Sequence, residues 1–367
     1  MSEARVTNLS NESNTGGPTI SGITTFSGTN YFLPPIGNTQ ERPLNPEPGS
    51  LRFNTDTTHL EYYRGDGIGW VELEATSDEL DGGTRGLVLG GSTPSQTDRI
   101  DYHNLSSPGT WVDFGNLFSG RYGCAATSSR TRGVIFGGYG SNTDTVDYVT
   151  ISTLGDSVDA LNTTTHKYCA VFGDGIRACV AGSYNPQLNT IDYVDIATLG
   201  SNNDFGDLTE AKGIMRGSNS STRGIIGGGY IAPSTLKIDY VTIASTGNAQ
   251  HFGDLISSTG QGGGNCSNAV RSFWGGQYNT VIGYITMATL GDALDFGDML
   301  ENSGHRPACA SPTRGMWCGG KGPASPYPAQ THVDYIEMAT TGNARDFGDL
   351  SQARSAGAAT SNGHGGL

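Results

Sequence analysis

The sequence predicts an all-β protein whose larger part is a six-bladed β-propeller closed by both ends of the chain. Three observations lead to this prediction: the composition, an internal repeat, and two complementary fragments that flank the repeats. The chain has 367 residues, of which 56 are glycine and only 15% are charged. No long stretch has helical periodicity, and such a composition is typical of short strands joined by tight turns.

The repeat consists of a glycine pair followed by an (I/V)DY triplet. The pairs lie at positions 90–91, 137–138, 227–228, 275–276 and 319–320, with Ala181 and Gly182 in the third copy. The triplet tyrosines are Tyr102, Tyr148, Tyr193, Tyr240, Tyr284 and Tyr335, which are 44 to 51 residues apart. A period in this range with four strand-sized runs per copy is the signature of propeller blades.

Each copy is expected to form four strands. In the second copy they are residues 121–127, 132–138, 144–152 and 158–161. In the other copies the fourth strand carries a Phe-Gly-(Asp/Asn)-Leu motif, with Met299 in place of Leu in the fifth copy. The phenylalanines of this motif are Phe114, Phe205, Phe252, Phe296 and Phe347.

The glycine pair, the tyrosine about ten residues later and the aromatic residue of the fourth strand resemble Kelch repeats. The resemblance covers about residues 82 to 367. In Kelch repeats the last aromatic residue is usually Trp, whereas here it is Phe. The resemblance implies a propeller fold but no particular partner, because a fold does not determine a function.

The two ends of the repeat region complement each other. The first copy begins at residue 82 and has no first strand before it, while residues 354–361 (RSAGAATS) match the first strand of the second copy, residues 121–128 (RYGCAATS). We therefore expect six blades, the first completed by the last strand of the chain. Closure of this kind removes the sheet edges that invite aggregation.

Arginine and aspartate recur together in five copies, with Arg about five residues before the glycine pair and Asp in the triplet. They are Arg85 and Asp101, Arg132 and Asp147, Arg177 and Asp192, Arg223 and Asp239, and Arg314 and Asp334. The fifth copy has Gly283 instead of Asp, and its Arg271 is shifted by one position. This pattern predicts that each Arg pairs with the Asp of its own or the next blade; the alternative, that both are merely solvated, stays open.

The sequence before the repeats predicts an extended arm at residues 1–48 and a small β-meander at residues 49–76, ahead of the propeller at 77–367. Residues 43–73 contain the elements LRFNT, EYY and a Gly-then-Trp ending at Trp70. This order resembles a module of tail-fibre and other appendage proteins of tailed bacteriophages. The upstream run ISGITTFSGTNYFLPP is similar to the start of virion proteins of cyanobacterial and marine phages. A small β-module that merely tethers a propeller is the alternative.

The loops after the second strand of each copy are the predicted binding surface. Aromatic residues begin most of them, with Asn, Ser and Gly beside them. The candidates are Tyr139, Asn142, Tyr184, Asn185, Tyr230, Tyr278, Asn279 and Tyr327. Tyrosine supplies rigid contact area and its small polar neighbours supply adaptable hydrogen bonds, which suits a glycan or a protein. The alternative is that these tyrosines only close the blade faces against one another.

Charge and motifs argue against several functions. The net charge of −14 and pI near 4.8 disfavour nucleic acid as a partner. Neither a membrane-spanning run nor a secretory signal is expected. The six cysteines are predicted to be free thiols, because equivalent strands of different blades lie too far apart for a disulfide. The seven histidines have no metal-ligand spacing, so we expect no metal and no cofactor. Glutamate is rare in the repeats and nearly every aspartate occupies a repeated position, whereas catalytic residues should break a repeat, so we expect no enzymatic activity.

The preferred interpretation is a phage virion structural protein, tail-fibre-like or another appendage, assembled in the host cytoplasm. Residues 1–76 would contact other virion proteins, and the propeller loops would bind a glycan or protein of the host surface. Attachment to a symmetric particle implies a homo-oligomer, with a trimer as the first expectation. The alternatives are a purely architectural decoration of tail, neck or capsid and, less favoured, a carbohydrate-active enzyme.

Overall fold

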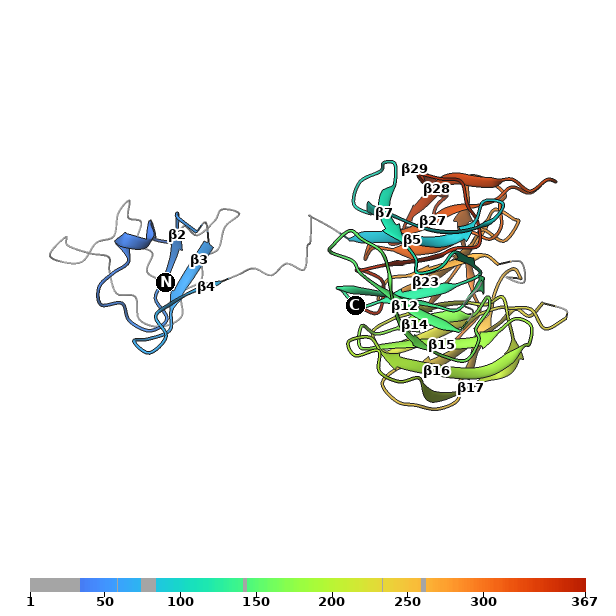
Figure 1. Ribbon diagram of the computed structural model, residues 1–367, viewed down its shortest axis with the longest axis horizontal. Helices are drawn as coiled ribbons and strands as arrows, with labels where there is room; N and C mark the ends of the chain where they lie inside the picture. Colours follow the sequence, from blue (N-terminus) through green and yellow to red (C-terminus); the bar gives the residue numbers. More distant parts are fainter. Residues whose placement is uncertain (1–33, 58, 74–83, 141–143, 233, 259–261) are drawn as a thin grey trace, which may run out of the picture. The chain divides into compact units, whose positions relative to one another are not determined.

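The computed structural model of the chain describes residues 34–57, 59–73, 84–140, 144–232, 234–258 and 262–367 (Figure 1). The chain forms two compact units, Met1–Ser77 and Asp78–Leu367. Over the described residues the only helical element is a short 3-10 turn, Thr39–Glu41, and the remaining regular structure is β-strand. The predicted all-β class is confirmed.

The first unit is a four-stranded sheet in the order β1 (Ile36–Gly37), β2 (Leu51–Asn54), β3 (His59–Tyr63), β4 (Trp70–Leu73). Strands β2 to β4 form the predicted antiparallel meander. Strand β1 adds to it in parallel, with Ile36 opposite Phe53, so residues expected at the end of the arm form part of this sheet. Residues 1–33 of the predicted arm lie outside the described part of the chain.

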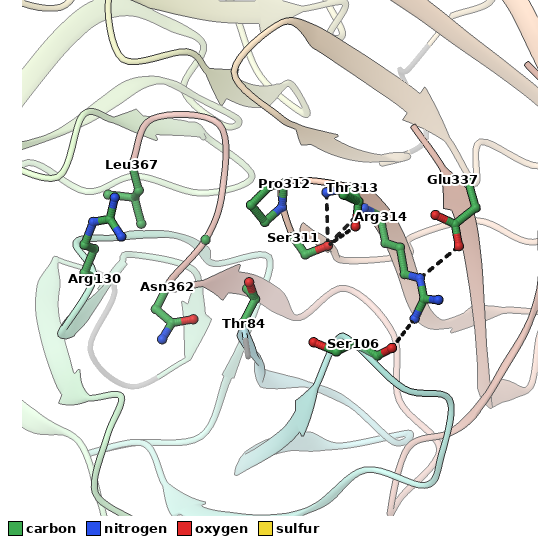
Figure 2. Close-up of a pocket in the computed structure, with 11 residues that line it drawn as sticks. Thr84, Ser106, Arg130, Ser311, Pro312, Thr313, Arg314, Glu337, Asn362 and Leu367 are labelled. Carbon is green, nitrogen blue, oxygen red and sulfur yellow. Dashed lines mark hydrogen bonds and ion pairs between the residues drawn. The ribbon is translucent and has the colours of Figure 1, made fainter. Parts of the chain in front are cut away.

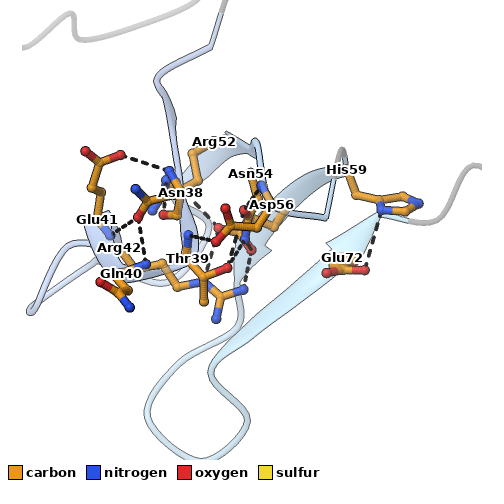
Figure 3. Close-up of polar contacts among 11 residues, drawn as sticks. Asn38, Thr39, Gln40, Glu41, Arg42, Arg52, Asn54, Asp56, His59 and Glu72 are labelled. Carbon is orange, nitrogen blue, oxygen red and sulfur yellow. Dashed lines mark hydrogen bonds and ion pairs between the residues drawn. The ribbon is translucent and has the colours of Figure 1, made fainter.

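A buried carboxylate joins the turn of this unit to its sheet. Figure 3 shows Asn38, Arg42 and Arg52 gathered around the start of the meander. Arg42 Nη2 lies 2.5 Å from Glu61 Oε2 and Arg52 Nε lies 3.5 Å from Glu61 Oε1. The hydrogen bond from Arg42 holds the pKa of Glu61 below its ordinary value. The Asn38 side chain accepts from the backbone N–H groups of Gln40 and Glu41, which caps the turn.

The described residues of the second unit form six four-stranded sheets, and in each the hydrogen-bonded neighbours are antiparallel. From the innermost strand outwards, the first two sheets are β9 (Ala125–Ser128), β10 (Arg132–Phe136), β12 (Thr145–Thr150) and β13 (Val158–Asn162), and then β14 (Ala170–Gly173), β15 (Arg177–Ser183), β16 (Leu188–Asp195) and β17 (Asn203–Lys212). The next two are β18 (Arg216–Asn219), β19 (Arg223–Gly227), β20 (Lys237–Thr242) and β21 (Gln250–Asp254), and then β22 (Gly264–Ser267), β23 (Arg271–Gly275), β24 (Val281–Thr286) and β25 (Leu294–Asp298). The last two are β26 (Ala308–Ala310), β27 (Arg314–Lys321), β28 (Ala329–Glu337) and β29 (Arg345–Asp349), and then β30 (Ala358–Ser361), β5 (Arg85–Ser92), β6 (Gln96–Asn104) and β7 (Val112–Asn116). A two-residue strand, β8 (Arg121–Tyr122), pairs with β11 (Tyr139–Gly140).

The last of these sheets joins segments from opposite ends of the unit. Strand β30 pairs antiparallel with β5, with Ala358 opposite Leu89 and Ser361 opposite Gly86. The predicted pairing of the C-terminal strand with the first copy is thereby confirmed. The innermost strands contact one another in the order β9, β14, β18, β22, β26, β30, and β30 in turn contacts β9.

The apolar core lies between consecutive sheets. Leu87 and Leu89 of one sheet pack with Cys124, Ile135 and Val149 of the next in a single buried cluster. The opposite face of β5 presents Val88 to another cluster with Met316 and Cys318 of β27. Strands such as β5 are therefore buried on both faces, which explains their continuous apolar sequence. All six cysteines are buried and free, as predicted.

The predicted pairing of arginine with the triplet aspartate is wrong. The register places Arg132 opposite Thr150, whereas Asp147 lies opposite Ile135, three residues along β10. Successive side chains of a strand point to opposite faces, so the two cannot meet. Each arginine instead lies over the ring of the triplet tyrosine, 4.4 to 5.1 Å from its centroid. Arg271 of the fifth copy does the same with Tyr284, so it is not displaced.

The same arginines connect each sheet to the next one. Arg132 Nη1 donates to the carbonyl oxygen of Ile196 at 2.8 Å, at the end of the third strand of the following sheet. The equivalent bonds run from Arg85 to Ile151, Arg177 to Ile243, Arg223 to Met287, Arg271 to Met338 and Arg314 to Leu105, at 2.6 to 3.3 Å. The last of these returns to the sheet that contains β5. Charged donors make strong hydrogen bonds, so this contact stabilises every junction between sheets.

The aspartates pair with a different set of basic side chains, which lie a few residues before the innermost strands. Arg121 Nη2 lies 2.7 Å from Asp147 Oδ2, and neither side chain is exposed. The corresponding pairs are Arg354 with Asp101, His166 with Asp192, Lys212 with Asp239 and Arg306 with Asp334, at 2.6 to 3.6 Å. Each pair ties the connection before a sheet's innermost strand to that sheet's third strand.

The Phe-Gly motif of the outermost strands has a structural cause. Its glycine approaches the backbone of the following sheet, so a Cβ at Gly115 would lie 2.4 Å from the carbonyl oxygen of Gly155. In return the N–H of Gly155 donates to the carbonyl oxygen of Phe114 at 2.9 Å. Phe114 also meets Tyr102 edge to face at 5.8 Å. The motif therefore fixes both the outer strand and the neighbouring loop.

Removal of one partner of a buried ion pair should be costly. We expect Arg121→Met to lower the free energy of unfolding by about 3–5 kcal/mol, because Asp147 would remain charged and buried. The double variant Arg121→Met/Asp147→Asn should lose less free energy of unfolding, because it leaves no buried charge without a partner. Chemical denaturation measures both, with Lys237→Met as the control, since its pair with Glu210 is half exposed and should be worth under about 1 kcal/mol. A loss below 1 kcal/mol for Arg121→Met would contradict this account.

Deletion of the strand that joins the two ends should destabilise the whole second unit. A chain that stops after Gly357 lacks β30, so β5 loses its inner partner and exposes a sheet edge. We expect a lower melting temperature and aggregation, measured by calorimetry and light scattering. A chain that stops after Gly366 keeps β30 and the hydrogen bonds of His364, and is the matched control. Equal melting temperatures for the two truncated chains would contradict the role assigned to β30.

Candidate functional site

The tyrosines of the predicted binding loops lie close together in space. Tyr139 stacks on Tyr122 with centroids 5.3 Å apart, and Tyr184 meets Tyr230 edge to face at 5.9 Å. Tyr168 joins these two pairs, at 5.6 Å from Tyr139 and 6.4 Å from Tyr184. A row of aromatic rings thus extends over three consecutive sheets.

The row continues to the other side of the unit through a histidine. His305 lies 6.2 Å from Tyr168 and 5.9 Å from Tyr278, and Tyr278 lies 6.5 Å from Tyr327. These rings are partly buried, and Tyr327 is the most open, with 51% of its surface exposed. We call the eight rings together the tyrosine face: Tyr122, Tyr139, Tyr168, Tyr184, Tyr230, Tyr278, His305 and Tyr327.

A narrow central cavity lies between the six innermost strands. It consists of two adjoining hollows of about 40 and 50 Å³ that share several lining residues. Arg216 lines the first hollow and His364 the second. A Cβ on Gly262 would lie 2.7 Å from His305 Nδ1 and 3.4 Å from Arg216 Nη2, so the arginine end of the cavity is next to the tyrosine face.

The C-terminal segment occupies the other end of the cavity. His364 Nε2 lies 2.7 Å from the carbonyl oxygen of Ser128, to which it donates. Its Nδ1 accepts from Asn219 Nδ2 and from the N–H of Gly366, both at 3.2 Å. The segment thus contacts both β9 and β18. The opposite end of the cavity, which Arg216 lines, lies beside the tyrosine face.

Burial shifts the pKa of four groups of the tyrosine face toward the neutral form. Burial raises the pKa of Tyr168 to about 12. It also raises the pKa of Tyr139 and of Tyr278. Burial, together with the positive charges of Arg216 and Lys321, lowers the pKa of His305 to about 4. The face therefore offers phenol O–H groups and a neutral imidazole as hydrogen-bonding groups.

The three predicted asparagines have different surroundings. Asn142 lies outside the described residues. Asn185 is exposed beside Tyr184. Asn279 accepts from the backbone N–H of Val281 and so supports its own turn. The tyrosines of the prediction are therefore assembled.

Sequence reasoning missed the aromatic residues that lie in the connections between sheets. Tyr122, Tyr168 and His305 each come a few residues before an innermost strand. In an antiparallel four-stranded unit, the connection to the next unit emerges at the same end as the loop between the second and third strands. Attention to this shared end would have placed these residues next to Tyr139 and Tyr184.

A pocket of about 540 Å³ opens at one side of the tyrosine face. Tyr278, His305, Lys321 and Tyr327 are among its lining residues. Another, of about 550 Å³, lies by the C-terminal segment (Figure 2). Arg314 in that pocket is already bonded to Glu337 and to the carbonyl of Ser106. We therefore regard the tyrosine face as the candidate site.

Within the described ranges, no group of three or more His, Cys, Asp or Glu side chains could hold a metal ion. Nor does that part of the chain contain a helix with the length and apolar character needed to cross a bilayer. The comparison with protein-family models finds no match to this sequence, and the comparison with curated proteins finds none either.

The buried histidine of the C-terminal segment should make stability depend on pH. Burial lowers the pKa of His364 to about 4, against about 6.5 in an unfolded chain. Between these values the unfolded state binds more protons, so the free energy of unfolding should fall as the pH drops from 6.5 to 4. The slope contributed by this residue is at most about 1.4 kcal/mol per pH unit.

Denaturation of His364→Gln across this pH range measures the contribution. Its free energy of unfolding should depend less steeply on pH than that of the unmodified protein. His251→Gln is the control, because His251 is exposed and should leave the slope unchanged. Parallel profiles for His364→Gln and the unmodified protein would contradict the assignment.

Proposed function

We propose that the six sheets of Asp78–Leu367 are the blades of a Kelch-like β-propeller. The order of contacts among the innermost strands, which returns from β30 to β9, supports this proposal. So do the repeated arginine contacts, of which the last leads from Arg314 back to Leu105. The single sheet built from β30 and β5 to β7 supplies the closure that such a fold needs.

We propose further that the protein is a structural component of a phage virion, tail-fibre-like or another appendage. The support is the module at residues 43–73, whose motifs fall on regular strands. Its LRFN run forms β2, its EYY run ends β3, and Trp70 begins β4. On this proposal residues 1–76 contact other virion proteins and the chain acts as a homo-oligomer, with a trimer as the first expectation.

The tyrosine face is the observation that supports a binding function for the propeller. Eight aromatic rings from several separate loops form one continuous surface beside a cavity mouth and a pocket of about 540 Å³. Aromatic residues with an apolar ring and a polar tip are enriched at binding surfaces. We infer that this face binds a glycan or a protein of the host surface, without catalysis.

A purely architectural role is the second candidate. The same rings pack mainly on one another and most are half-buried, which is also what a closing layer over the cavity would require. In that role the propeller would decorate a tail, neck or capsid and would have no external ligand.

Cell binding separates the two roles. The full chain, labelled fluorescently, is incubated with a panel of cyanobacterial cells and with a glycan array. For the binding function we expect saturable binding that falls at least about tenfold in Tyr184→Ala/Tyr327→Ala, because an anchoring tyrosine contributes about 2 kcal/mol or more. Ile176→Ala is the control, since Ile176 is 69% exposed and lines a pocket with Gly366 and Leu367 of the C-terminal segment, not one with the tyrosine face. Absence of binding to every cell and sugar would favour the architectural role.

A further inference from the structure

Three cations near the tyrosine face have no acidic partner, although the chain carries a net charge of −14. Among the described residues, Arg216, Lys321 and Lys167 take part in no ion pair. The Lys167 ammonium lies 4.9 Å from the centroid of the Tyr139 ring. Lys321 lines the pocket beside Tyr278 and Tyr327. At this end of the unit, three basic side chains are therefore not neutralised by an ion pair with a described carboxylate.

Arg216 is the cation placed most specifically. It begins β18 and lines the end of the central cavity next to His305. Its Nε donates to the carbonyl oxygen of Gly263 at 2.5 Å, Nη1 to that of Met215 at 3.1 Å and Nη2 to that of Gly262 at 3.4 Å. These three acceptors are uncharged and orient the guanidinium. Two of its five N–H donors remain, one on each terminal nitrogen.

The size of the spaces limits what an occupant can be. The hollow beside Arg216 has a volume of about 40 Å³, which accommodates one or two waters or a carboxylate but no ring. The pocket on the face, at about 540 Å³, can receive a larger group. His305 lines that pocket, and its Nδ1 has no hydrogen-bond partner within the described residues. The hollow and the pocket share no lining residue, but His305 of the pocket and Arg216 of the hollow both lie next to Gly262. An occupant that reached from the pocket to Arg216 would carry a small anionic group on a polar ring.

We propose that the tyrosine face binds acidic saccharides, with the sugar carboxylate held by Arg216 and Lys321 and the sugar rings lying on the tyrosines. The inference rests on the binding function proposed for this face and specifies its ligand class. A planar carboxylate matches the two free guanidinium donors in geometry and charge. Saccharide rings present apolar C–H groups and hydroxyls, which match the aromatic surfaces and phenol O–H groups.

The test uses the full chain and three polymers, polygalacturonate, alginate and hyaluronan, each paired with its own carboxyl-reduced form. The reduced polymer keeps the rings and linkages and lacks the charge. Biolayer interferometry measures binding of each pair to the immobilised protein. We expect at least one acidic polymer to bind, at least about tenfold more tightly than its reduced form, because a hydrogen bond to a charged group contributes that much. No binding by any of the three acidic polymers, or equal binding within every pair, overturns the inference.

Variants locate the site. Arg216→Met and Lys321→Met should each weaken binding of the acidic polymer about tenfold or more and leave the reduced polymer unaffected. Lys321 lies at the open pocket, so Lys321→Met should fold normally. It therefore tests the site even if the Arg216 variant misfolds. The matched control is Arg345→Met, which removes the same charge from an exposed position on β29 and should change binding less than twofold. Equal losses in Arg345→Met and Lys321→Met would show a general charge effect and overturn the assigned site.

The cell-binding experiment distinguishes failure of this inference from failure of the proposed function. Binding to cells that survives removal of acidic polysaccharide, but not protease treatment, would show a protein receptor and overturn the saccharide assignment alone. If no cells bind the unmodified protein or its variants, the proposed binding function itself is contradicted.

Discussion

The arginine at the start of each second strand is the contact on which the second unit depends. It lies over the triplet tyrosine of its own sheet and donates to a carbonyl oxygen of the next one. One side chain therefore fixes both the internal packing of a sheet and its angle to its neighbour. Because six such contacts lead around to the sheet that contains β5, a change at one junction must be accommodated by the others.

The buried carboxylates of the triplets are paired with basic side chains other than these arginines. Asp101, Asp147 and Asp239 are fully buried, and each meets a cation from the connection that precedes an innermost strand. The pairs of Arg121 with Asp147 and of His166 with Asp192 hold two of these connections in place, and the same two connections carry Tyr122 and Tyr168. The structural ion pairs and the tyrosine face are thus two consequences of the same loops. Arg216, which has no such carboxylate, is the cation left available at the cavity.

Repetition made much of this fold predictable. The period and the Phe-Gly motif located the strands, and the match between residues 354–361 and 121–128 predicted the pairing of β30 with β5. The partner of Arg132 was mispredicted because co-occurrence in a repeat does not distinguish a neighbour on the same face from one on the opposite face. The glycine pair was also shifted in some copies. The first glycine with a positive φ is Gly228 in the fourth copy and Gly276 in the fifth, each five residues after its arginine.

The sequence alone determined the strand order and the pairing of the C-terminal strand with the first copy, because both follow from local periodicity and from matching fragments. It also placed five tyrosines in loops at one end of the sheets. Only the tertiary structure decided that Tyr122, Tyr168 and His305 complete a continuous face and that Arg216 lies at the cavity beside it. These contacts join residues from different repeats, and their distances depend on how whole sheets pack, which no local pattern records.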